Sequence, residues 1–264
     1  MSAMFSNAVA YDRYMGRWSR LLAPLFVEFA QVGEGSKVLD VGCGTGVLSE
    51  TLASLTGASE IIGIDRSDAF VDHGQTRSTD PRIKCELGDA VDLPYPDNTF
   101  DHCLSLLVLQ LIPDREKALS EMCRVTRRGG SVSACNWDGG GRMELQSTFR
   151  EEAGKLDPAG FQKLTNHLLR PYSEGELKEL WKATGFQEVQ ETGFKIDLAF
   201  ACFEDYWLPQ LHAVGPVGSY LASLPSDGQE ALRSAMWKRF LGDGPDGPFR
   251  LHAQAWAVRG RLPQ

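Results

Sequence analysis

Residues 38–46 read Val-Leu-Asp-Val-Gly-Cys-Gly-Thr-Gly, an apolar run that ends in alternating glycines. The apolar residues from 36 to 41 predict a buried parallel strand. The glycines predict a tight turn in which no Cβ keeps a ligand away from the backbone. Residues 47–55 have helical spacing, so a helix is expected to begin after Gly46 and to direct free N–H groups at that ligand. The stretch therefore indicates a strand, a ligand-binding turn and a helix.

The spacing of these glycines bears on the kind of ligand. A dinucleotide-binding turn has the pattern G-x-G-x-x-G, which needs a third glycine at the position of Val47. The turn here is G-x-G-x-G, and it also lacks the Lys-Ser/Thr pair of a phosphate-binding P-loop. The pattern argues against a pyrophosphate cradle.

The alternation of strands and helices continues beyond the turn. The expected elements are strands at 61–64, 82–87, 100–107 and 131–137 and helices at 67–77 and 114–126. Gly129 and Gly130 are expected to stop the second of these helices. Strands that alternate with helices of about 10–13 residues predict a parallel sheet with helices on both faces.

After Trp137 this rhythm breaks at the flexible stretch Asp-Gly-Gly-Gly, residues 138–141. The expected elements beyond it are helical structure over 143–169, an amphipathic helix over 173–184, a strand over 186–196, helical structure over 198–247 and a last strand over 249–260. Ser173 is expected to be the N-cap of its helix, with Glu176 completing a capping box and Gly185 at the C-terminal end.

Composition narrows the class of protein. The chain has 264 residues, of which 42% are hydrophobic and 23% are charged, as is usual for a globular domain. It has 27 Lys and Arg against 35 Asp and Glu, which gives a formal net charge of −8. Nucleic-acid binders usually carry a basic excess, because phosphate neutralisation supplies much of their affinity. A nucleic-acid substrate is therefore not expected.

Cysteines and histidines give no sign of a metal or redox site. The six cysteines include no CxxC pair, and the five histidines have no ligand spacing. Reduced thiols in a cytoplasmic protein are expected. Charged residues such as Asp12 and Arg17 interrupt any secretory signal, and no apolar run is long enough for a membrane span.

Three acids lie at or near the ends of expected strands. In a doubly wound sheet, Asp65 at the end of the second strand lies beside the glycine turn, where its carboxylate can accept both hydroxyls of a ribose. Asp89 follows the third strand, where an adenine edge would lie. Asp40 lies inside the first strand and needs a partner, for which a ligand ammonium is one candidate. For each acid, a purely structural role in a turn, at a helix start or in the core is the alternative.

Four motifs, in order, carry a resemblance to a known family. They are residues 39–46, Gly63-Ile64-Asp65, Gly88-Asp89-Ala90 and residues 93–101, Leu-Pro-Tyr-Pro-Asp-Asn-Thr-Phe-Asp. With these motifs the chain resembles the class I S-adenosylmethionine-dependent methyltransferases, and in particular the ubiquinone/menaquinone C-methyltransferase-like branch. The resemblance is good over 36–137 and weaker over 172–189. It implies an α/β fold with a Rossmann-like, doubly wound sheet of seven strands, mostly parallel, with one antiparallel strand near 251–258.

The resemblance also implies a domain organisation and an activity. The chain is expected to be a single methyltransferase domain over 1–264, with N-terminal lid helices at 1–30, a cofactor-binding core at 36–137 and helical cap insertions at 138–171 and 198–248. The implied activity is methyl transfer from S-adenosylmethionine to a small-molecule acceptor by in-line displacement. Aromatic residues near 203–209 would suit a flat or apolar acceptor, although ordinary core packing also explains them. No catalytic residue is assigned, because a base is needed only if the acceptor must lose a proton.

Carried over by position, the resemblance assigns residues to parts of the cofactor. The glycine turn would lie along the methionine part, Asp65 would hold the ribose hydroxyls and Arg66 would flank the adenine. Asp89 would accept a hydrogen bond from the adenine amino group, with the Ala90 amide alongside. The full set of expected cofactor-binding residues is Asp40, Gly42, Cys43, Gly44, Thr45, Gly46, Asp65, Arg66, Asp89, Ala90, Leu106, Leu107, Tyr11 and Arg17.

Some of these positions have a second interpretation. Leu106 and Leu107 would line the sulfonium region, and Tyr11 and Arg17 would close over the methionine end. Residues 11–18 could instead form an amphipathic helix packed on the sheet, and Cys43 could be small filler. Family members often have a histidine or aromatic residue near position 110, where this chain has Gln110. A histidine base is therefore not expected there.

Two other functions remain open from the residues. One is a non-catalytic S-adenosylmethionine-binding protein, for which the departure at Gln110 leaves room. The other is an NAD-dependent oxidoreductase, because Asp65 would serve a ribose there too. Val47 in place of a glycine counts against the second.

Overall fold

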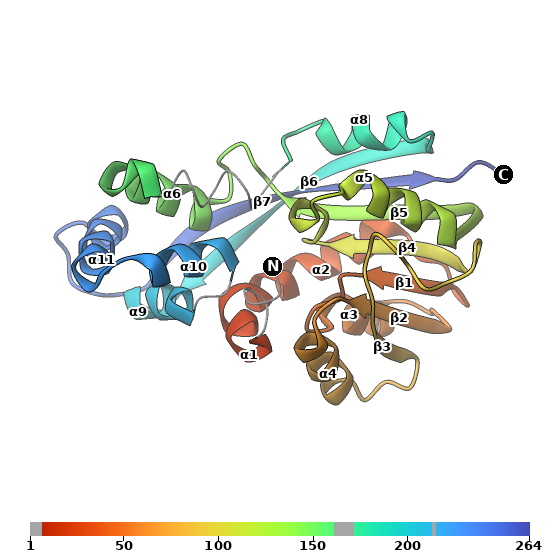
Figure 1. Ribbon diagram of the computed structural model, residues 1–264, viewed down its shortest axis with the longest axis horizontal. Coiled ribbons are helices and arrows are strands. Elements are labelled where there is room, and N and C mark those ends of the chain that lie inside the picture. Colours follow the sequence, from red (N-terminus) through yellow and green to blue (C-terminus); the bar gives the residue numbers. More distant parts are fainter. Residues whose placement is uncertain (1–6, 161–171, 213–214) are drawn as a thin grey trace.

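A mixed sheet of seven strands runs through the molecule in the order β3-β2-β1-β4-β5-β7-β6 (Figure 1). The computed structural model describes residues 7–160, 172–212 and 215–264. The strands are β1 (Lys37–Val41), β2 (Glu60–Asp65), β3 (Ile83–Leu87), β4 (Phe100–Leu106), β5 (Thr126–Trp137), β6 (Gln187–Phe200) and β7 (Phe249–Arg261). β7 pairs antiparallel with both β5 and β6, and the pairs among β1 to β5 are parallel. The expected α/β fold with one antiparallel strand is confirmed.

Helices cover both faces of this sheet (Figure 1). The α-helices are α1 (Ala8–Tyr11), α2 (Arg17–Ala30), α3 (Val47–Leu55), α4 (Asp68–Arg77), α5 (Arg115–Val125), α6 (Glu144–Leu156), α8 (Glu176–Ala183), α9 (Phe203–Trp207), α10 (Gly215–Ser223) and α11 (Ser226–Leu241). The helices α2 and α3 bury Phe26 and Leu52 against one face, and α5 and α8 bury Met122 and Trp181 against the other. Burying an apolar side chain of this size contributes roughly 1.5–3 kcal/mol.

The order of the strands reverses direction at β1. Its neighbours in the sheet are β2 on one side and β4 on the other. In doubly wound sheets, a crevice opens outside the carboxyl ends of the strands at such a switch point. The turn that follows β1 therefore lies at the position where this architecture binds ligands.

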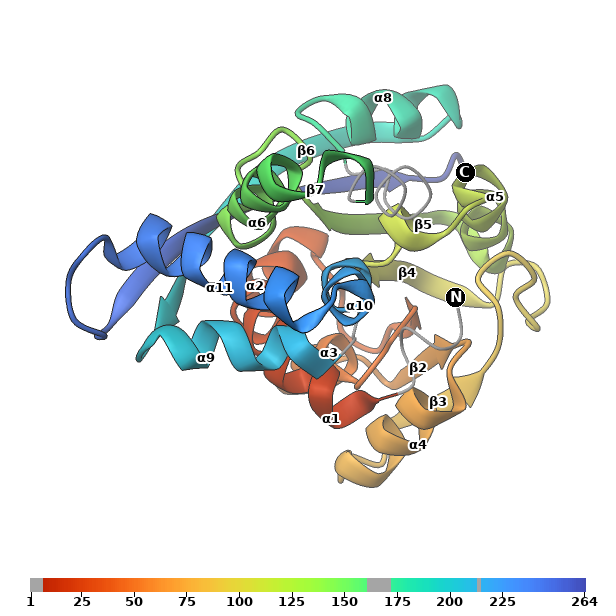
Figure 2. The same cartoon turned by 60° about the vertical axis from the view of Figure 1, so that its left-hand side comes forward.

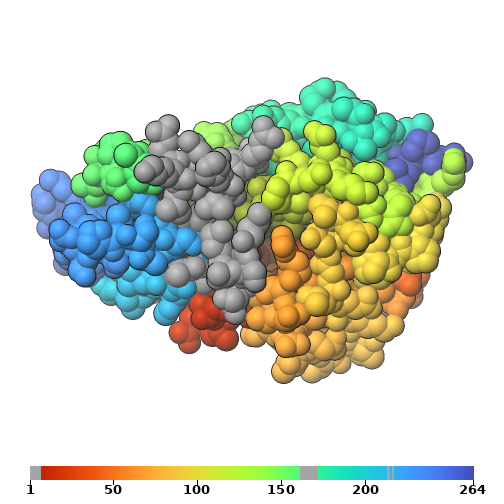
Figure 3. Space-filling model, viewed as in Figure 1, coloured from red at the N-terminus to blue at the C-terminus, as the bar shows by residue number. Residues whose placement is uncertain are grey.

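The cap is the end of the molecule formed by α6, α9, α10, α11 and the ends of β6 and β7 that reach them (Figure 2). Aromatic rings hold it together. The ring of Phe200 lies 5.0 Å from that of Phe249 and 5.6 Å from that of Tyr206, and Phe240 lies 4.9 Å from Tyr206. The cap and the parallel part of the sheet form opposite ends of the surface (Figure 3). The helices α6, α9, α10 and α11 fall within the ranges 138–171 and 198–248 for which cap insertions were expected, and their role as insertions stays a prediction.

The N-terminal segment divides into a packed helix and a shorter piece. Leu22, Ala23 and Phe26 of α2 have no exposed surface, and α2 lies against α3. This helix is part of the core, and it contains only the last two residues of the stretch 11–18 for which a packed amphipathic helix was the alternative. Before it come α1 and a π-helical turn, Asp12–Gly16. Such π-helical turns are rare and are frequent at functional sites.

Gly129 and Gly130 do not stop a helix, contrary to the expectation from the sequence. The helix α5 ends at Val125, and β5 begins at Thr126, so both glycines lie inside the strand. Gly129 has a φ of +69°, and a Cβ on Gly130 would meet the carbonyl oxygen of Asp101 at 2.6 Å. The glycines instead let β5 pass close to β4.

The N-terminus of α8 also differs from the expectation. The helix begins at Glu176 with Gly175 as its cap, so Ser173 is not the N-cap. Glu191 of β6 accepts hydrogen bonds from the N–H groups of Gly175 at 2.8 Å and Lys178 at 3.0 Å. A carboxylate from a neighbouring strand thus satisfies the donors of this helix. Of the capping box, only the bond from the Ser173 N–H to Glu176 forms, at 2.7 Å.

Two further boundaries differ. The strand β6 extends to Phe200, with Ile196, Leu198 and Phe200 buried at alternate positions, so the segment expected to be helical from 198 starts as a strand. Of the helical range 143–169, α6 covers Glu144–Leu156, and residues 161–169 lie outside the described residues.

Candidate functional site

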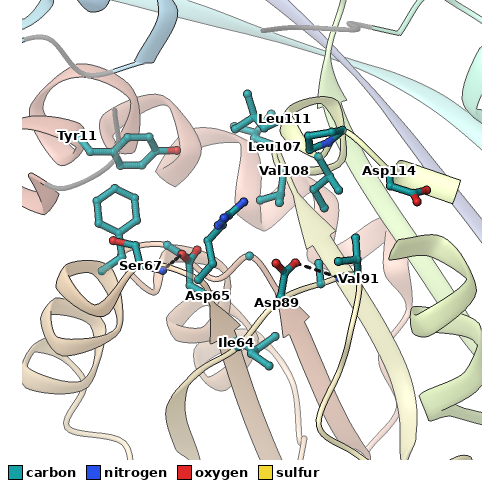
Figure 4. A pocket seen from close by; sticks show the side chains of 18 residues that line it. Tyr11, Ile64, Asp65, Ser67, Asp89, Val91, Leu107, Val108, Leu111 and Asp114 are labelled. Atoms are coloured by element: carbon teal, nitrogen blue, oxygen red, sulfur yellow. Dashed lines mark hydrogen bonds between the residues drawn. The ribbon is translucent and has the colours of Figure 1, made fainter. Parts of the chain in front are cut away.

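A cavity of about 340 Å³ opens at the carboxyl ends of β1, β2, β3 and β4 (Figure 4). It is lined by Tyr11, Gly42, Gly44, Ile64, Asp65, Arg66, Ser67, Phe70, Gly88, Asp89, Ala90, Val91, Leu107, Val108, Leu111, Ile112, Pro113 and Asp114. Its volume is at the lower end of the range found for small-molecule sites, and its walls are mainly apolar with three carboxylates, those of Asp65, Asp89 and Asp114. The switch point of the sheet therefore holds a pocket for a small ligand.

The glycine turn, residues 42–46, packs closely against neighbouring side chains. Gly42 has a φ of +74°, and a Cβ there would lie 2.5 Å from the side-chain methyl carbons of Val108. Below the turn, a Cβ on Gly63 would lie 2.8 Å from the Cβ of Cys43. Only glycine fits these positions without movement of a neighbour. The close packing of the turn fixes the wall of the cavity.

Most N–H groups of the turn are already used within the protein. Gly42 and Cys43 both donate to the carbonyl oxygen of Ile64, at 2.7 and 3.0 Å. Gly44 donates to Oδ2 of Asp65 at 3.0 Å. These N–H groups do not face the cavity as anion donors. The geometry agrees with the glycine spacing, which argues against a pyrophosphate cradle.

Asp65 links the turn to the second strand. Besides the Gly44 N–H, its carboxylate accepts the Ser67 N–H through Oδ1 at 2.9 Å. Burial raises the pKa of Asp65, and the backbone donors from Ser67 and Gly44 act in the opposite direction. The backbone N–H of Arg66 also acts on this carboxylate, which has about four lone-pair sites in all. Figure 4 shows the side chain at the edge of the cavity. The carboxylate is therefore held in place by backbone donors and keeps some acceptor capacity for a ligand hydroxyl.

Asp89 supplies the second carboxylate of the site. It follows β3, and its Oδ1 accepts the N–H of Val91 at 3.2 Å (Figure 4). This bond fixes the carboxylate at the base of the cavity and leaves Oδ2 for a ligand donor. The side chains of Ile64 and Val91 lie beside it as an apolar wall. The base of the cavity suits a flat ring with a hydrogen-bond donor on its edge.

The opposite wall is made by Tyr11 and the loop after β4. The ring of Tyr11 lies 5.2 Å from that of Phe70, and its hydroxyl points toward the cavity (Figure 4). Burial raises the pKa of Tyr11 to about 12, so the hydroxyl is neutral near pH 7. Leu107 has a φ of +64°, an unusual value for a residue with a Cβ. Such strain costs about 1–3 kcal/mol and is common where a ligand is held.

The expected cofactor-binding residues divide into two groups. Those that line the cavity are Tyr11, Gly42, Gly44, Asp65, Arg66, Asp89, Ala90 and Leu107. Those that lie away from its lining are Asp40, Cys43, Thr45, Gly46, Leu106 and Arg17. For the second group, the structure gives other contacts.

Asp40 lies inside the protein below the turn. Its Oδ2 accepts the hydroxyl of Ser49 at 2.7 Å, and the residue is 1% exposed. Burial raises the pKa of Asp40 to about 7. The partner of this acid is therefore a serine of α3, and burial favours the protonated form of the carboxyl.

Thr45 and Arg17 hold neighbouring segments together. The Thr45 hydroxyl donates to Oδ1 of Asp12 at 2.7 Å, which ties the glycine turn to the π-helical turn. Arg17 forms an ion pair with Asp205 of α9 at 2.6 Å, and its guanidinium lies over the ring of Trp18. Arg17 thus connects α2 to the cap in this structure.

The other three residues pack against the protein. Cys43 is 6% exposed and fills the space beside Gly63. Leu106 belongs to the main apolar cluster, and Gly46 has the left-handed conformation that precedes α3.

Several lining residues did not emerge from the sequence. Val108, Leu111, Ile112 and Pro113 come from the loop after β4, and Phe70 comes from the first turn of α4. A signal for the loop exists, because residues 106–113 are almost entirely apolar directly after a strand. An apolar loop at the carboxyl edge of a sheet has to pack on something, and here it walls the cavity.

Within 7–160, 172–212 and 215–264, no group of three or more His, Cys, Asp or Glu side chains could hold a metal ion. The helices of these ranges are all too short or too polar to cross a membrane.

Comparison with sequence families gives a match within the first half of the chain. Residues 39–134 match the family described as methyltransferase domain. The methyltransferase GfsG of Streptomyces halstedii is 34% identical over 145 residues, which are 50% of this chain and 52% of that protein. The demethylmenaquinone methyltransferase of Staphylococcus carnosus is 42% identical over 127 residues, 47% of this chain and 51% of that protein. The chain spans about half the length of the curated relatives it matches.

Solved structures resemble the whole chain at lower identity. The YcgJ protein of Bacillus subtilis has a TM-score of 0.61 and 18% identity, covering 94% of this chain and 99% of that one. The phosphoethanolamine N-methyltransferase 2 of Haemonchus contortus, in a complex with S-adenosylhomocysteine, has a TM-score of 0.59 and 21% identity, covering 97% of this chain and 57% of that one. The [4+2]-cyclase SpnF has a TM-score of 0.58 and 20% identity over 93% of this chain and 81% of that one. At these identities the likeness shows the fold alone.

Proposed function

We propose, from the premise that residues 39–134 form a class I methyltransferase domain of the menaquinone-type branch, that this protein transfers the methyl group of S-adenosylmethionine to a small-molecule acceptor. The observation that carries the proposal is the Asp65 carboxylate, which is held between the N–H groups of Gly44 and Ser67 at the edge of the cavity. It lies beside a glycine turn whose N–H groups are mostly engaged and therefore do not suit a diphosphate.

The residues of the cavity fit the parts of S-adenosylmethionine. We assign the ribose hydroxyls to the remaining acceptor capacity of Asp65, and the adenine amino group to Oδ2 of Asp89. The Ala90 amide and Arg66 would flank the adenine. A Cβ on Gly44 would have no atom closer than 3.8 Å, so there is space above the turn for the methionine part. Leu107 would line the sulfonium region, with Tyr11 on the other side.

The bound cofactor supplies a methyl group that is already electrophilic. The protein then has two tasks, to align the acceptor and to exclude water, and alignment alone can supply several kcal/mol of the barrier reduction. Tyr11, Leu107 and Val108 would exclude water, because each presents an apolar surface beside the carboxylates. The neutral Tyr11 hydroxyl could orient a polar atom by hydrogen bonding. We assign no residue as a base.

We also propose the class of acceptor and the location of the protein. Relatives named as demethylmenaquinone methyltransferases, together with the aromatic cap, favour a flat and largely apolar acceptor over a nucleic acid. All six cysteines are free thiols, which is usual in the reducing cytoplasm.

One observation favours a second candidate function. The [4+2]-cyclase SpnF has the same fold, so the fold alone does not fix the reaction. A protein that binds the cofactor without transferring methyl is therefore the alternative. A homocysteine-release screen over aromatic and aliphatic acceptors separates the two, since turnover with any acceptor removes the alternative.

The direct test is calorimetry on the purified chain. S-adenosylmethionine and S-adenosylhomocysteine should bind, and NADH should not. Asp65→Ala should weaken the binding of S-adenosylhomocysteine by about 1–3 kcal/mol, which is the scale of lost hydrogen bonds to a charged group. Asp68→Ala is the control, because Asp68 is an exposed acid in the first turn of α4 that does not line the cavity. No binding of either compound by folded protein contradicts the function, and equal affinity of Asp65→Ala contradicts the ribose assignment.

A further inference from the structure

Arg150 of α6 is a half-buried cation without an acidic partner. Its guanidinium donates one hydrogen bond, to Oε1 of Gln146 at 3.2 Å. It makes no ion pair with a carboxylate of the described residues, although most buried or half-buried arginines have one. The segments 1–6, 161–171 and 213–214 contain no Asp or Glu. The chain therefore has no carboxylate side chain that pairs with Arg150.

Other arginines show how this chain satisfies a guanidinium. Arg124 pairs with Glu121 at 2.7 Å. Arg259 also lacks an acid within ion-pair distance, but it donates to the carbonyl oxygen of Phe29 at 3.2 Å and to Gln190 at 3.0 Å, and it lies over the ring of Phe29. A guanidinium has five N–H donors. With one acceptor for five donors, Arg150 is the less satisfied of the two.

Burial makes this deficit costly. A half-buried charge loses part of its hydration and needs acceptors in return. Burial lowers the pKa of Arg150, which is the sign of such a loss. The chain keeps the cation at this place without supplying its counter-charge. The missing counter-charge is what a ligand can provide.

The surroundings of Arg150 add a hydrogen-bond donor and no acid. Arg150 and Tyr14 lie close enough to influence each other electrostatically, and burial raises the pKa of Tyr14, so its phenol stays neutral. The Tyr14 hydroxyl makes no hydrogen bond to the described residues. Elsewhere in the same large apolar cluster, the buried indole Nε1 of Trp137 has no hydrogen-bond partner among the described residues. The described surroundings of Arg150 therefore offer the Tyr14 hydroxyl and no carboxylate.

The position of Arg150 and Tyr14 relative to the cofactor cavity indicates which part of the reaction they serve. Tyr11 lines that cavity, whereas Tyr14, which follows it in the π-helical turn, and Arg150 do not. In Figure 1, the cap helix α6 that carries Arg150 lies on the side of the molecule away from α4 and β3. Arg150 and Tyr14 therefore lie outside the lining of the cofactor cavity, with Arg150 in the cap.

We propose that the acceptor carries an anionic oxygen group, and that Arg150 binds this group with the help of the Tyr14 hydroxyl. The inference rests on the proposed function and names its substrate class: a flat or apolar body that bears a carboxylate, a phosphate or an ionised phenol. Hydrogen bonds from a guanidinium to such a group are charge-assisted and about twice as strong as neutral ones. Arg150 here is a specificity residue that holds the acceptor.

The test compares anionic and neutral probes of the same shape. Protein saturated with S-adenosylhomocysteine is titrated with benzoate against benzamide, and with phenyl phosphate against benzyl alcohol. We expect at least one anion to bind tenfold or more tightly than its neutral counterpart. The anion that shows the larger preference tells a carboxylate site from a phosphate site. Arg150→Gln should abolish the preference, and Arg150→Lys, which keeps the charge, should retain part of it.

Matched variants separate binding from folding. Lys155→Gln removes an exposed cation from the same helix and should leave the preference unchanged. Tyr14→Phe should reduce it a few-fold. Affinity for S-adenosylhomocysteine should stay within threefold in Arg150→Gln. A tenfold loss would assign Arg150 to the carboxylate of the cofactor and overturn the proposal.

Two further outcomes overturn the proposal that Arg150 binds an anionic acceptor group. A third outcome concerns only the proposed methyltransferase function. The proposal fails if the wild-type protein shows no anion preference, including the case in which no probe binds, or if Arg150→Gln keeps the preference. If S-adenosylhomocysteine itself does not bind, the proposed function fails, and the same probe pairs are then titrated into the free protein. An anion preference that depends on Arg150 would still establish the anion site.

Discussion

The carboxyl edge of the parallel strands and the cap are built on different physical principles. At the carboxyl edge, backbone lies against backbone and side chain at distances that admit no extra atom, as at Gly42 against Val108. In the cap, rings pack against rings, as Phe200 does against Phe249 at 5.0 Å. The first region is defined by positions where only one residue type fits, and the second by apolar bulk of about the right size.

This difference bears on how the two regions can vary. Apolar residues in a packed cluster tolerate replacement by others of similar volume, usually at a cost below about 1.5 kcal/mol. A glycine at a positive φ tolerates no such replacement. The match to the methyltransferase domain covers 39–134, which contains the glycine turn, Asp65 and Asp89 and ends before the cap helices. Under the proposed function, the tightly packed carboxyl edge would bind the cofactor and the more tolerant cap would face the acceptor.

The largest effect should come from Gly42→Ala. The new Cβ would lie 2.5 Å from Val108, at a φ of +74°. Overpacking costs about 1–3 kcal/mol, and an alanine at positive φ costs about 1 kcal/mol more. We expect the free energy of unfolding to fall by about 2–4 kcal/mol in urea denaturation, and the affinity for S-adenosylhomocysteine to fall with it.

Gly35→Ala separates strain from steric conflict. Gly35 has a φ of +70°, but a Cβ there would meet nothing within 4 Å. The loss of stability should be about 1 kcal/mol, the conformational part alone. Equal losses for the two variants would show that Val108 moves aside without cost, and the contrast between the two regions would then be wrong.

The same contrast explains how much of the fold could be predicted from the sequence. Around the glycine turn, strands and helices were predicted to within a few residues, because apolar runs and glycines there have one structural meaning. Ser173 and the glycines 129 and 130 were misread, because their roles depend on partners far along the chain. Glu191 caps α8 from a different strand, and Asp101 makes glycine necessary at 130. Short-range patterns do not reveal such partners.

The site was predictable to a similar extent. Asp65, Asp89 and Gly42 were predicted to lie together because they stand at or just after the ends of strands, which meet at one edge of the sheet, and all three line the cavity. Arg17 and Asp40 were assigned to the cofactor, but the structure gives each a protein partner, Asp205 and Ser49. Whether a charged residue faces a ligand or the protein depends on packing in three dimensions. Their roles in binding therefore remain predictions that mutation can test.

An intermediate effect should come from Asp40→Asn. This variant tests whether the core below the glycine turn, where Asp40 lies, excludes water. The pKa of Asp40 is raised from 3.8 to about 7 by burial. The folded protein therefore holds a proton that the unfolded chain releases between these values, so stability should fall as pH rises from about 4 to 7 and level off above. The slope is at most about 1.4 kcal/mol per pH unit. Asp40→Asn should remove this part of the pH dependence in urea denaturation at pH 5, 6, 7 and 8.

Glu60→Gln is the opposite control. Hydrogen bonds from Lys84 and Lys37 lower the pKa of Glu60, so its contribution to stability is present above its usual pKa of 4.5 and is lost as pH falls. Because this loss occurs below pH 4.5, Glu60→Gln should leave the slope of the profile between pH 5 and 8 as it is in the wild-type protein, in contrast to Asp40→Asn. The free energy of unfolding of the wild-type protein and that of Asp40→Asn could instead vary with pH in the same way across pH 5–8. That result would mean that water reaches Asp40 below the glycine turn.

The smallest effect should come from Arg17→Ala, which tests the boundary between the two regions. Arg17 of α2 pairs with Asp205 of the cap and lies over Trp18, but its side chain is 27% exposed and that of Asp205 is 32% exposed. Pairs this accessible contribute about 0–1 kcal/mol, so unfolding in urea should become easier by no more than that. Asp205→Asn, which leaves Arg17 in place, should cost a similar amount. Affinity for S-adenosylmethionine should change less than twofold in both variants, because Arg17 does not line the cavity. A tenfold loss of affinity for S-adenosylmethionine in Arg17→Ala, but not in Asp205→Asn, would contradict this. It would mean that Arg17 leaves Asp205 to bind the methionine carboxylate, so that α2 takes part in cofactor binding.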